Sequence, residues 1–158
     1  MARFEIGTVS EGTLRTEDLL PAFADALMAF PLPTILRSFI SAHKVDQLVR
    51  EANGFDWDSE DAEQNASELI NEIAQEINAM CPPFVYFGSL AGDGACFGFW
   101  PDHDEIQEAQ RFGTVYEADR EYIYSDDHGV WTHVNDHGNV MVLTDDDGKP
   151  GNEIWSAV

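Results

Sequence analysis

Closely spaced carboxylates surround a tryptophan in the middle of this 158-residue sequence. These residues, here called the acidic set, are Asp56, Trp57, Asp58, Glu60, Asp61, Glu68, Glu72 and Glu76. Carboxylates attract cations and basic protein surfaces, and a tryptophan beside them can anchor a protein interface because its large ring buries well. The chemistry that this pattern predicts is therefore binding rather than bond making.

The glutamates of the acidic set follow a four-residue spacing, which places them along one side of a predicted helix. Residues four apart advance about 6 Å along a helix, close to two phosphate steps of about 3.4 Å along one DNA strand. Such a row also suits an ordinary solvated helix face. That alternative normally brings lysine or arginine four residues away, and the span from Glu51 to Gln110 contains neither. The missing bases favour a binding face.

Histidine and aspartate in the second half of the chain offer nitrogen and oxygen ligands of the kind that metals accept. This group is His128, His133, Asp136 and His137. A helical metal motif places two histidines four apart on one face, whereas His133 and His137 flank a predicted hairpin turn, where Asp, Gly and Asn are ordinary turn residues. We therefore predict no metal and no cofactor. A metal-dependent hydrolase built on these four residues stays open as an alternative.

Other catalytic patterns do not occur in the sequence. Cys81 and Cys96 lie among apolar residues and far from any base, which is typical of buried free thiols rather than of nucleophiles or a disulfide. No serine stands in a Gly-x-Ser-x-Gly pattern, and Gly92-Asp93-Gly94 lacks the lysine of a phosphate-binding loop. We therefore predict that the protein is not an enzyme.

Acidic residues outnumber basic ones along most of the chain, which carries a formal net charge of -22. Residues 1–50 hold six acids and five bases, whereas 24 acids and three bases follow Arg50. Nucleic-acid binding by the chain itself is disfavoured, because such affinity comes mainly from lysine and arginine. No apolar run reaches the roughly 18 residues of a membrane span, and the N-terminal segment lacks the apolar run of a signal peptide. We expect a cytoplasmic protein with no membrane partner.

Helices are predicted mainly in the first half of the chain and strands in the second. Helices are expected from Thr16 to about residue 28, over 35–52 as two short helices or one kinked helix, from just after Ser59 to Met80, and over 102–110. Strands are expected over 4–9, 84–89, 95–100, 121–124, 130–135, 140–144 and 153–158. The turn signal Gly92-Asp93-Gly94 joins the two aromatic strands into a hairpin.

The predicted helix that carries the acidic set shows the clearest pattern of the sequence. Its apolar stripe is Ala62, Ala66, Leu69, Ile70, Ile73, Ile77 and Met80. Asp58 or Ser59 is expected to cap its start, and Cys81-Pro82-Pro83 to end it. Helices early and antiparallel strands late define an α+β class, with N-terminal helices packed on a mainly antiparallel sheet formed largely by the C-terminal half. The length fits one domain over residues 1–158.

Several aromatic and glycine-rich segments are distributed over most of the chain. They are Tyr86-Phe87-Gly88, Gly92-Asp93-Gly94-Ala95, Phe97-Gly98-Phe99-Trp100, Val134-Asn135-Asp136-His137-Gly138-Asn139-Val140 and Glu153-Ile154-Trp155, with Phe4-Glu5-Ile6-Gly7-Thr8 and Thr16-Glu17-Asp18-Leu19-Leu20 near the start. Together they resemble a family of short acidic proteins of unassigned function that phages, plasmids and integrative elements carry. The resemblance implies a genomic setting in which small acidic proteins, including anti-CRISPR and antirestriction proteins, disarm host defence.

Charge and resemblance together predict a non-enzymatic inhibitor of a bacterial defence complex. The expected partner is a basic protein surface that normally holds nucleic acid, and the acidic set is expected to contact it as a DNA mimic does. Complementary charge also suits a second class, an immunity or antitoxin protein that neutralises a basic toxin nuclease. A neighbouring toxin gene would distinguish this class from the first.

Overall fold

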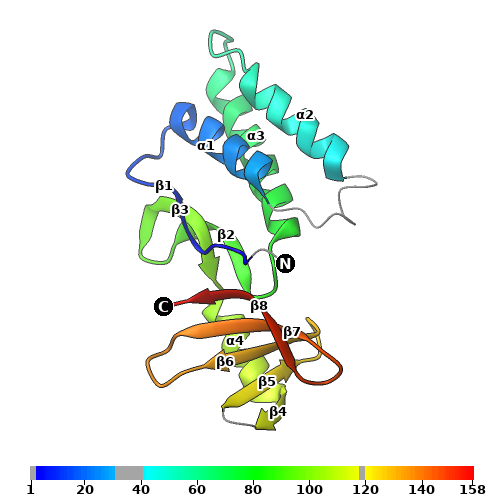
Figure 1. Cartoon of the computed structure of the whole chain (residues 1–158). Coiled ribbons are helices and arrows are strands. Elements are labelled where there is room, and N and C mark those ends of the chain that lie inside the picture. The colour runs from blue at the N-terminus through cyan, green and yellow to red at the C-terminus, as the bar shows by residue number, and fades with distance from the viewer. Residues whose placement is uncertain (1–2, 31–40, 118–119) are drawn as a thin grey trace. The chain divides into compact units, whose positions relative to one another are not determined.

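The computed structural model describes residues 3–30, 41–117 and 120–158, which form two compact units (Figure 1). The first, here called the helical unit, comprises Thr8–Cys81 and Phe87–Gly98. The second, here called the sheet unit, comprises the chain up to Gly7, together with Pro82–Tyr86 and Phe99–Val158. That residues 1–158 make one folding domain stays a prediction.

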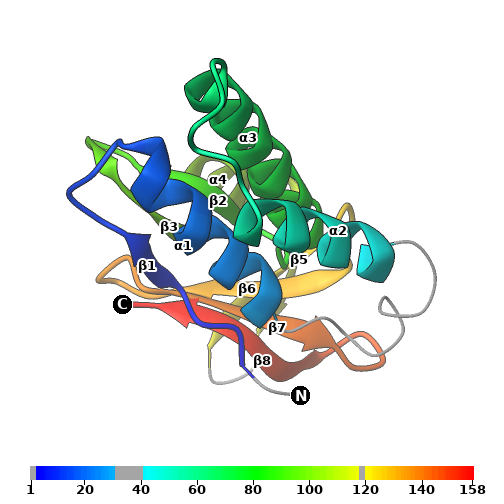
Figure 2. The same cartoon turned by 90° about the horizontal axis from the view of Figure 1, so that it is seen from above.

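Three helices make up most of the helical unit, and they are α1 (Thr16–Ala29), α2 (Ser41–Asn53) and α3 (Ala62–Met80). Each of the three contacts the other two, and Figures 1 and 2 show them side by side. Their apolar stripes meet in a core that contains Leu20 and Leu27 of α1 and Leu48 of α2. From α3 it receives Ala66, Ile70, Ile73 and Ile77. Burial of this face stabilises α3, because most helical stability in proteins comes from packing of an amphipathic face.

In addition to these helices, the chain forms a three-stranded sheet with the strand order β1-β3-β2. Its strands are β1 (Gly7–Ser10), β2 (Val85–Leu90) and β3 (Asp93–Pro101). Phe23 of α1 contacts two rings of the sheet edge-on, Phe87 at 4.8 Å and Phe97 at 5.4 Å between ring centroids. The Asn78 amide at the end of α3 binds the backbone of Phe87 twice, donating to its carbonyl at 2.8 Å and accepting from its N–H at 2.8 Å. These contacts fix β2 against the helices.

The sheet unit contains an antiparallel meander of five strands in the order β4-β5-β6-β7-β8, with α4 (His103–Phe112) against β5. The strands are β4 (Thr114–Glu117), β5 (Glu121–Ser125), β6 (Val130–Val134), β7 (Val140–Asp145) and β8 (Pro150–Ala157). Trp155, Val142 and Thr132 have no exposed surface and form the centre of this core. Gly113 ends α4 where a Cβ atom would lie 2.4 Å from the Tyr124 carbonyl oxygen of β5, so only glycine lets the helix end this close to the strand.

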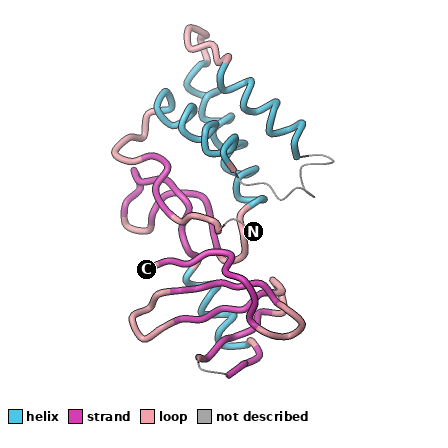
Figure 3. Tube along the Cα trace, in the orientation of Figure 1, coloured by secondary structure: helices cyan, strands magenta, loops and turns pink. Residues whose placement is uncertain are grey.

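The predicted α+β class is confirmed, with the five-stranded sheet in the C-terminal half (Figure 3). A helical region was predicted over 35–52. Residues 35–40 of it lie outside the described residues, and the rest corresponds to α2, which begins at Ser41. The strand predicted over 4–9 begins three residues later, at Gly7. The predicted cap of α3 is wrong, because the helix begins at Ala62 and Asp61 occupies the capping position without a side-chain hydrogen bond. The prediction omitted β4.

Cys81 and Cys96 are free thiols, as predicted, and Cys96 is buried. Burial raises the pKa of Cys81 from 9.0 to about 12, because the thiolate would lose its hydration. The thiolate is the reactive form. We therefore expect Cys81 to react with iodoacetamide at pH 8 about a thousandfold more slowly in the native chain than in the unfolded chain, as measured by peptide mass spectrometry.

The same pKa shift makes stability fall at alkaline pH. Above the ordinary thiol pKa of 9.0 the unfolded chain releases the Cys81 proton while the native chain retains it, so the free energy of unfolding decreases as pH rises. Below that pH both states are protonated and the contribution is constant. Cys81→Ser provides the control, since its urea midpoint should lose this part of the pH dependence. Equal labelling of Cys81 in native and guanidinium-unfolded protein would contradict the expectation.

No described helix combines the length and apolar character needed to cross a membrane.

Candidate functional site

The structure brings part of the acidic set together around a hollow between α2 and α3. The hollow measures about 420 Å³, and the carboxylates that line it are Glu51, Asp56, Glu68 and Glu72. Phe55 and Leu69 contribute apolar surface to its lining. Glu51 was not predicted as a site residue. These four carboxylates and the space between them are here called the acidic hollow.

The loop that carries Asp56 is held by its own hydrogen bonds. Gly54 ends α2 with its N–H on the Arg50 carbonyl oxygen at 3.0 Å. Asp56 then accepts the Asp58 N–H on its side chain at 3.1 Å, and its carbonyl accepts the Ser59 hydroxyl at 3.1 Å. This local turn chemistry is typical of aspartate and serine. It holds Asp56 in the lining of the hollow that Glu68 and Glu72 of α3 also line.

Two carboxylates of the acidic hollow are oriented by neutral amides on their own helices. Gln47 donates to Glu51 on α2 at 2.8 Å, and Gln64 donates to Glu68 on α3 at 2.9 Å. Both donors lie four residues before their acceptor, so they occupy the same side of the helix. A neutral donor fixes a carboxylate in position while leaving its charge intact. The acidic hollow therefore keeps the charges that a basic partner would meet.

Glu76 forms an ion pair, whereas among the described residues no base pairs with a carboxylate of the acidic hollow. Its carboxylate lies 2.8 Å from the Lys44 ammonium group of α2, and only 14% of its side chain is exposed. The hydrogen bond and the charge of Glu76, with a smaller contribution from Glu72, raise the pKa of Lys44. The lysine that pairs with Glu76 thus comes from another helix, outside the base-free span of the sequence. Glu76 stabilises the contact between α2 and α3 rather than offering a free charge.

Trp57 lies in a separate hollow of about 250 Å³, with Arg15, Glu17 and Glu63 among its neighbours. Its ring lies 4.6 Å from that of Phe55 and is 39% exposed. Arg15 and Glu17 form an ion pair with each other. The remaining members of the acidic set, Asp58, Glu60 and Asp61, are exposed in the loop before α3. Glu60 therefore stands outside the helical row in which its spacing placed it.

The histidine group predicted as an alternative metal site is not brought together. His128 lies 3.0 Å from Glu105 of α4, whereas His133 binds the Glu121 carbonyl oxygen at 2.7 Å. His137 is exposed in the turn between β6 and β7, where the Asn135 side chain accepts its N–H at 2.9 Å. Within the ranges that the structure describes, no group of three or more His, Cys, Asp or Glu side chains is placed to hold a metal ion.

The structure thus separates the acidic set into the hollow around Asp56, the paired Glu76, and the loop with Trp57. Comparison of the chain with protein families, with curated proteins and with solved structures found no significant match.

Proposed function

We propose that this chain is a non-enzymatic inhibitor that binds a basic surface of a bacterial defence complex and excludes its nucleic acid. The observation that carries the proposal is the acidic hollow, in which four carboxylates meet without a basic residue in the lining. The hollow is shallow and partly apolar, so a lysine or arginine side chain of a partner can insert its charge and rest its aliphatic stem on Phe55 and Leu69. The partner contacts are assigned to Glu51, Asp56, Glu68 and Glu72.

Electrostatics make such an interaction fast and sensitive to salt. Complementary charge raises association rates by steering the encounter, and salt screens that steering over about 8–10 Å. A chain of net charge -22 repels nucleic acid and is attracted to the surfaces that hold it. The resemblance of the sequence to acidic proteins of phages and plasmids supports this choice of partner, because such elements meet the defence complexes of their host.

A displacement assay tests the proposal directly. Purified CRISPR effector complexes, restriction enzymes and a basic toxin nuclease are each loaded with fluorescent DNA, and anisotropy is followed as this chain is added. We expect saturable displacement from one of the defence complexes at about 50 mM salt and much weaker displacement at about 200 mM. Displacement from the toxin nuclease alone would replace the proposal with an immunity function. No displacement from any partner would overturn it.

Removing Lys44 should strengthen the interaction, which is the opposite of most surface substitutions. Lys44→Gln eliminates the positive charge that pairs with Glu76 and lies near Glu72, so it makes the face more negative. We expect an affinity gain of about threefold at low salt, mainly in the association rate. Surface plasmon resonance with the partner from the displacement assay measures both rates.

Arg111→Gln is the matched control for Lys44→Gln, because Arg111 is exposed on α4 of the sheet unit and its removal changes the net charge equally. It should leave the association rate nearly unchanged. Equal gains in the two variants would show that only net charge matters. In that case the assignment to the acidic hollow would be wrong.

A further inference from the structure

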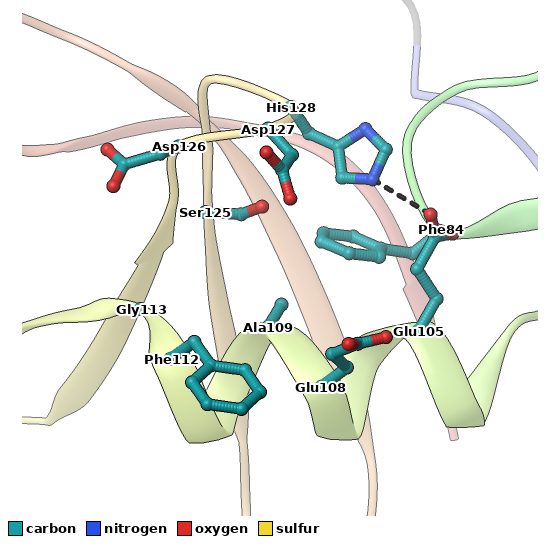
Figure 4. Close-up of a pocket in the computed structure, with 10 residues that line it drawn as sticks. All are labelled: Phe84, Glu105, Glu108, Ala109, Phe112, Gly113, Ser125, Asp126, Asp127 and His128. Carbon is teal, nitrogen blue, oxygen red and sulfur yellow. Dashed lines mark hydrogen bonds and ion pairs between the residues drawn. The ribbon is translucent and has the colours of Figure 1, made fainter.

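A second hollow, in the sheet unit, carries a different combination of groups. It measures about 440 Å³ and lies between α4 and the turn that joins β5 to β6 (Figure 4). Glu105 and Glu108 line it from α4, Ser125 from the end of β5 and Asp127 from the turn, while Phe84 reaches it from the segment before β2. This space is here called the turn hollow. Its volume is in the usual range of small-molecule sites, about 300–1,000 Å³.

The charges around the turn hollow are almost all negative. Glu105, Glu108, Asp126 and Asp127 line it, and no lysine or arginine does. Glu105 lies 3.0 Å from His128, but the other three acids form no ion pair with any described residue. In Figure 4 the Asp127 side chain points toward α4, whereas the Asp126 carboxylate points to the side. The hollow therefore offers several separated carboxylates to a cation.

Ser125 provides a second and independent indication of a ligand. The residue is only 5% exposed, and its side chain points into the hollow (Figure 4). None of the hydrogen bonds among the described residues uses its hydroxyl group, although its backbone carbonyl accepts the Gly129 N–H at 2.8 Å. A donor group bound in the hollow would form a hydrogen bond with this hydroxyl.

Aromatic rings complete the turn hollow. Phe84 is 2% exposed and contacts His128 edge-on, with 4.6 Å between ring centroids. Its backbone has a φ of 62, which is unfavourable for a bulky residue, and its carbonyl is held by the Asp102 N–H at 2.9 Å. Phe112 borders the hollow from α4 and is 74% exposed. Rings beside carboxylates suit a cation that is carried on an aliphatic chain.

We propose that the turn hollow binds an aliphatic ammonium group, supplied either by a free diamine or by a lysine side chain of a protein. The ammonium group donates hydrogen bonds to Glu108, Asp127 and the Ser125 hydroxyl, and its methylene chain lies against the exposed ring of Phe112. A metal ion is a poorer fit, because within the described residues the acidic side chains do not converge as metal ligands do. The site lies in the sheet unit and does not depend on the inhibitor proposal.

A titration of the full-length, 15N-labelled chain followed by NMR tests this site. The probes are cadaverine, Nα-acetyl-lysine methylamide and Mg²⁺ at matched ionic strength. We expect saturable shifts confined to α4 and residues 125–129 with the ammonium probes, and tighter binding of cadaverine would indicate a free diamine as the natural source. Ser125→Ala, which changes no charge, should weaken binding about threefold, and Glu108→Gln with Asp127→Asn about tenfold.

The matched control is Glu117→Gln with Glu121→Gln, which also removes two carboxylates of the sheet unit. These residues face each other across β4 and β5, and neither lines the turn hollow. The control should bind both ammonium probes like the unchanged chain. Equal weakening by both double variants, the same shifts with Mg²⁺, or no saturable shift would overturn the proposal. Because Ser125→Ala leaves the charge unchanged, its loss of affinity for the ammonium probes measures the contribution of the hydroxyl group and not that of general charge attraction.

Discussion

Replacing Glu68 and Glu72 by lysine together should weaken binding to the basic partner by at least about a hundredfold. Both carboxylates line the acidic hollow, so each reversal removes an attraction and adds a repulsion at the centre of the proposed contact. Glu76 is left unchanged, because it is paired with Lys44 and does not line the acidic hollow. Anisotropy competition against labelled DNA on the defence complex measures the affinity.

A second double reversal, Glu11→Lys with Asp25→Lys, separates the site from the overall charge. Both residues are exposed and belong to the helical unit, and neither lines the acidic hollow. The net charge changes by the same amount, so a site-specific interaction should lose less than about threefold in affinity. Circular dichroism confirms that both variants are folded. Unchanged binding of the Glu68 and Glu72 variant would show that the partner contacts another face.

Trp155→Ala should destabilise the chain by about 3–5 kcal/mol. The side chain has no exposed surface, lies across from Val142 in β7, and donates from its indole nitrogen to the Pro83 carbonyl at 2.8 Å. Truncation leaves a cavity in the sheet unit and an acceptor without its donor. Because whole domains are stable by only about 5–15 kcal/mol, we expect a large fall in the urea midpoint, measured by far-UV circular dichroism.

Trp155→Phe separates the hydrogen bond from the packing. Phenylalanine fills most of the space but cannot donate to Pro83, so the expected loss is about 1–3 kcal/mol. Its urea midpoint should therefore lie between those of the unchanged chain and of Trp155→Ala. A loss below about 1 kcal/mol in Trp155→Ala would contradict the central place of this side chain in the core.

The periodicity of the sequence was sufficient to predict most of the elements. The stripe of α3 has an apolar residue at each turn, and Ala66, Ile70, Ile73 and Ile77 are buried as that pattern indicates. The hairpin of β2 and β3 and the strands β5 to β8 have alternating or apolar runs with Gly, Asp and Asn between them. These are local signals, which depend on neighbours in the sequence. They are therefore available without knowledge of the fold.

Features that depend on distant residues were not predictable in the same way. β4 is a four-residue edge strand with mostly exposed side chains. It is extended because it pairs with β5. Lys44 and Glu76 meet although 31 residues of other structure separate them. Glu51 joins Asp56 and Glu72 only because α2 and α3 pack together. Charge and spacing identified the acidic segment, but packing decided which of its carboxylates converge.

The contact between Asn78 and Phe87 also affects how this chain behaves among its own copies. β2 is an edge strand of the three-stranded sheet, and an edge normally exposes backbone groups that can pair with a strand of another molecule. The Asn78 amide occupies both the N–H and the carbonyl of Phe87, as a neighbouring strand would. A single side chain of α3 thus occupies the backbone groups that an added strand would need at this point, and we expect it to oppose aggregation through the aromatic hairpin.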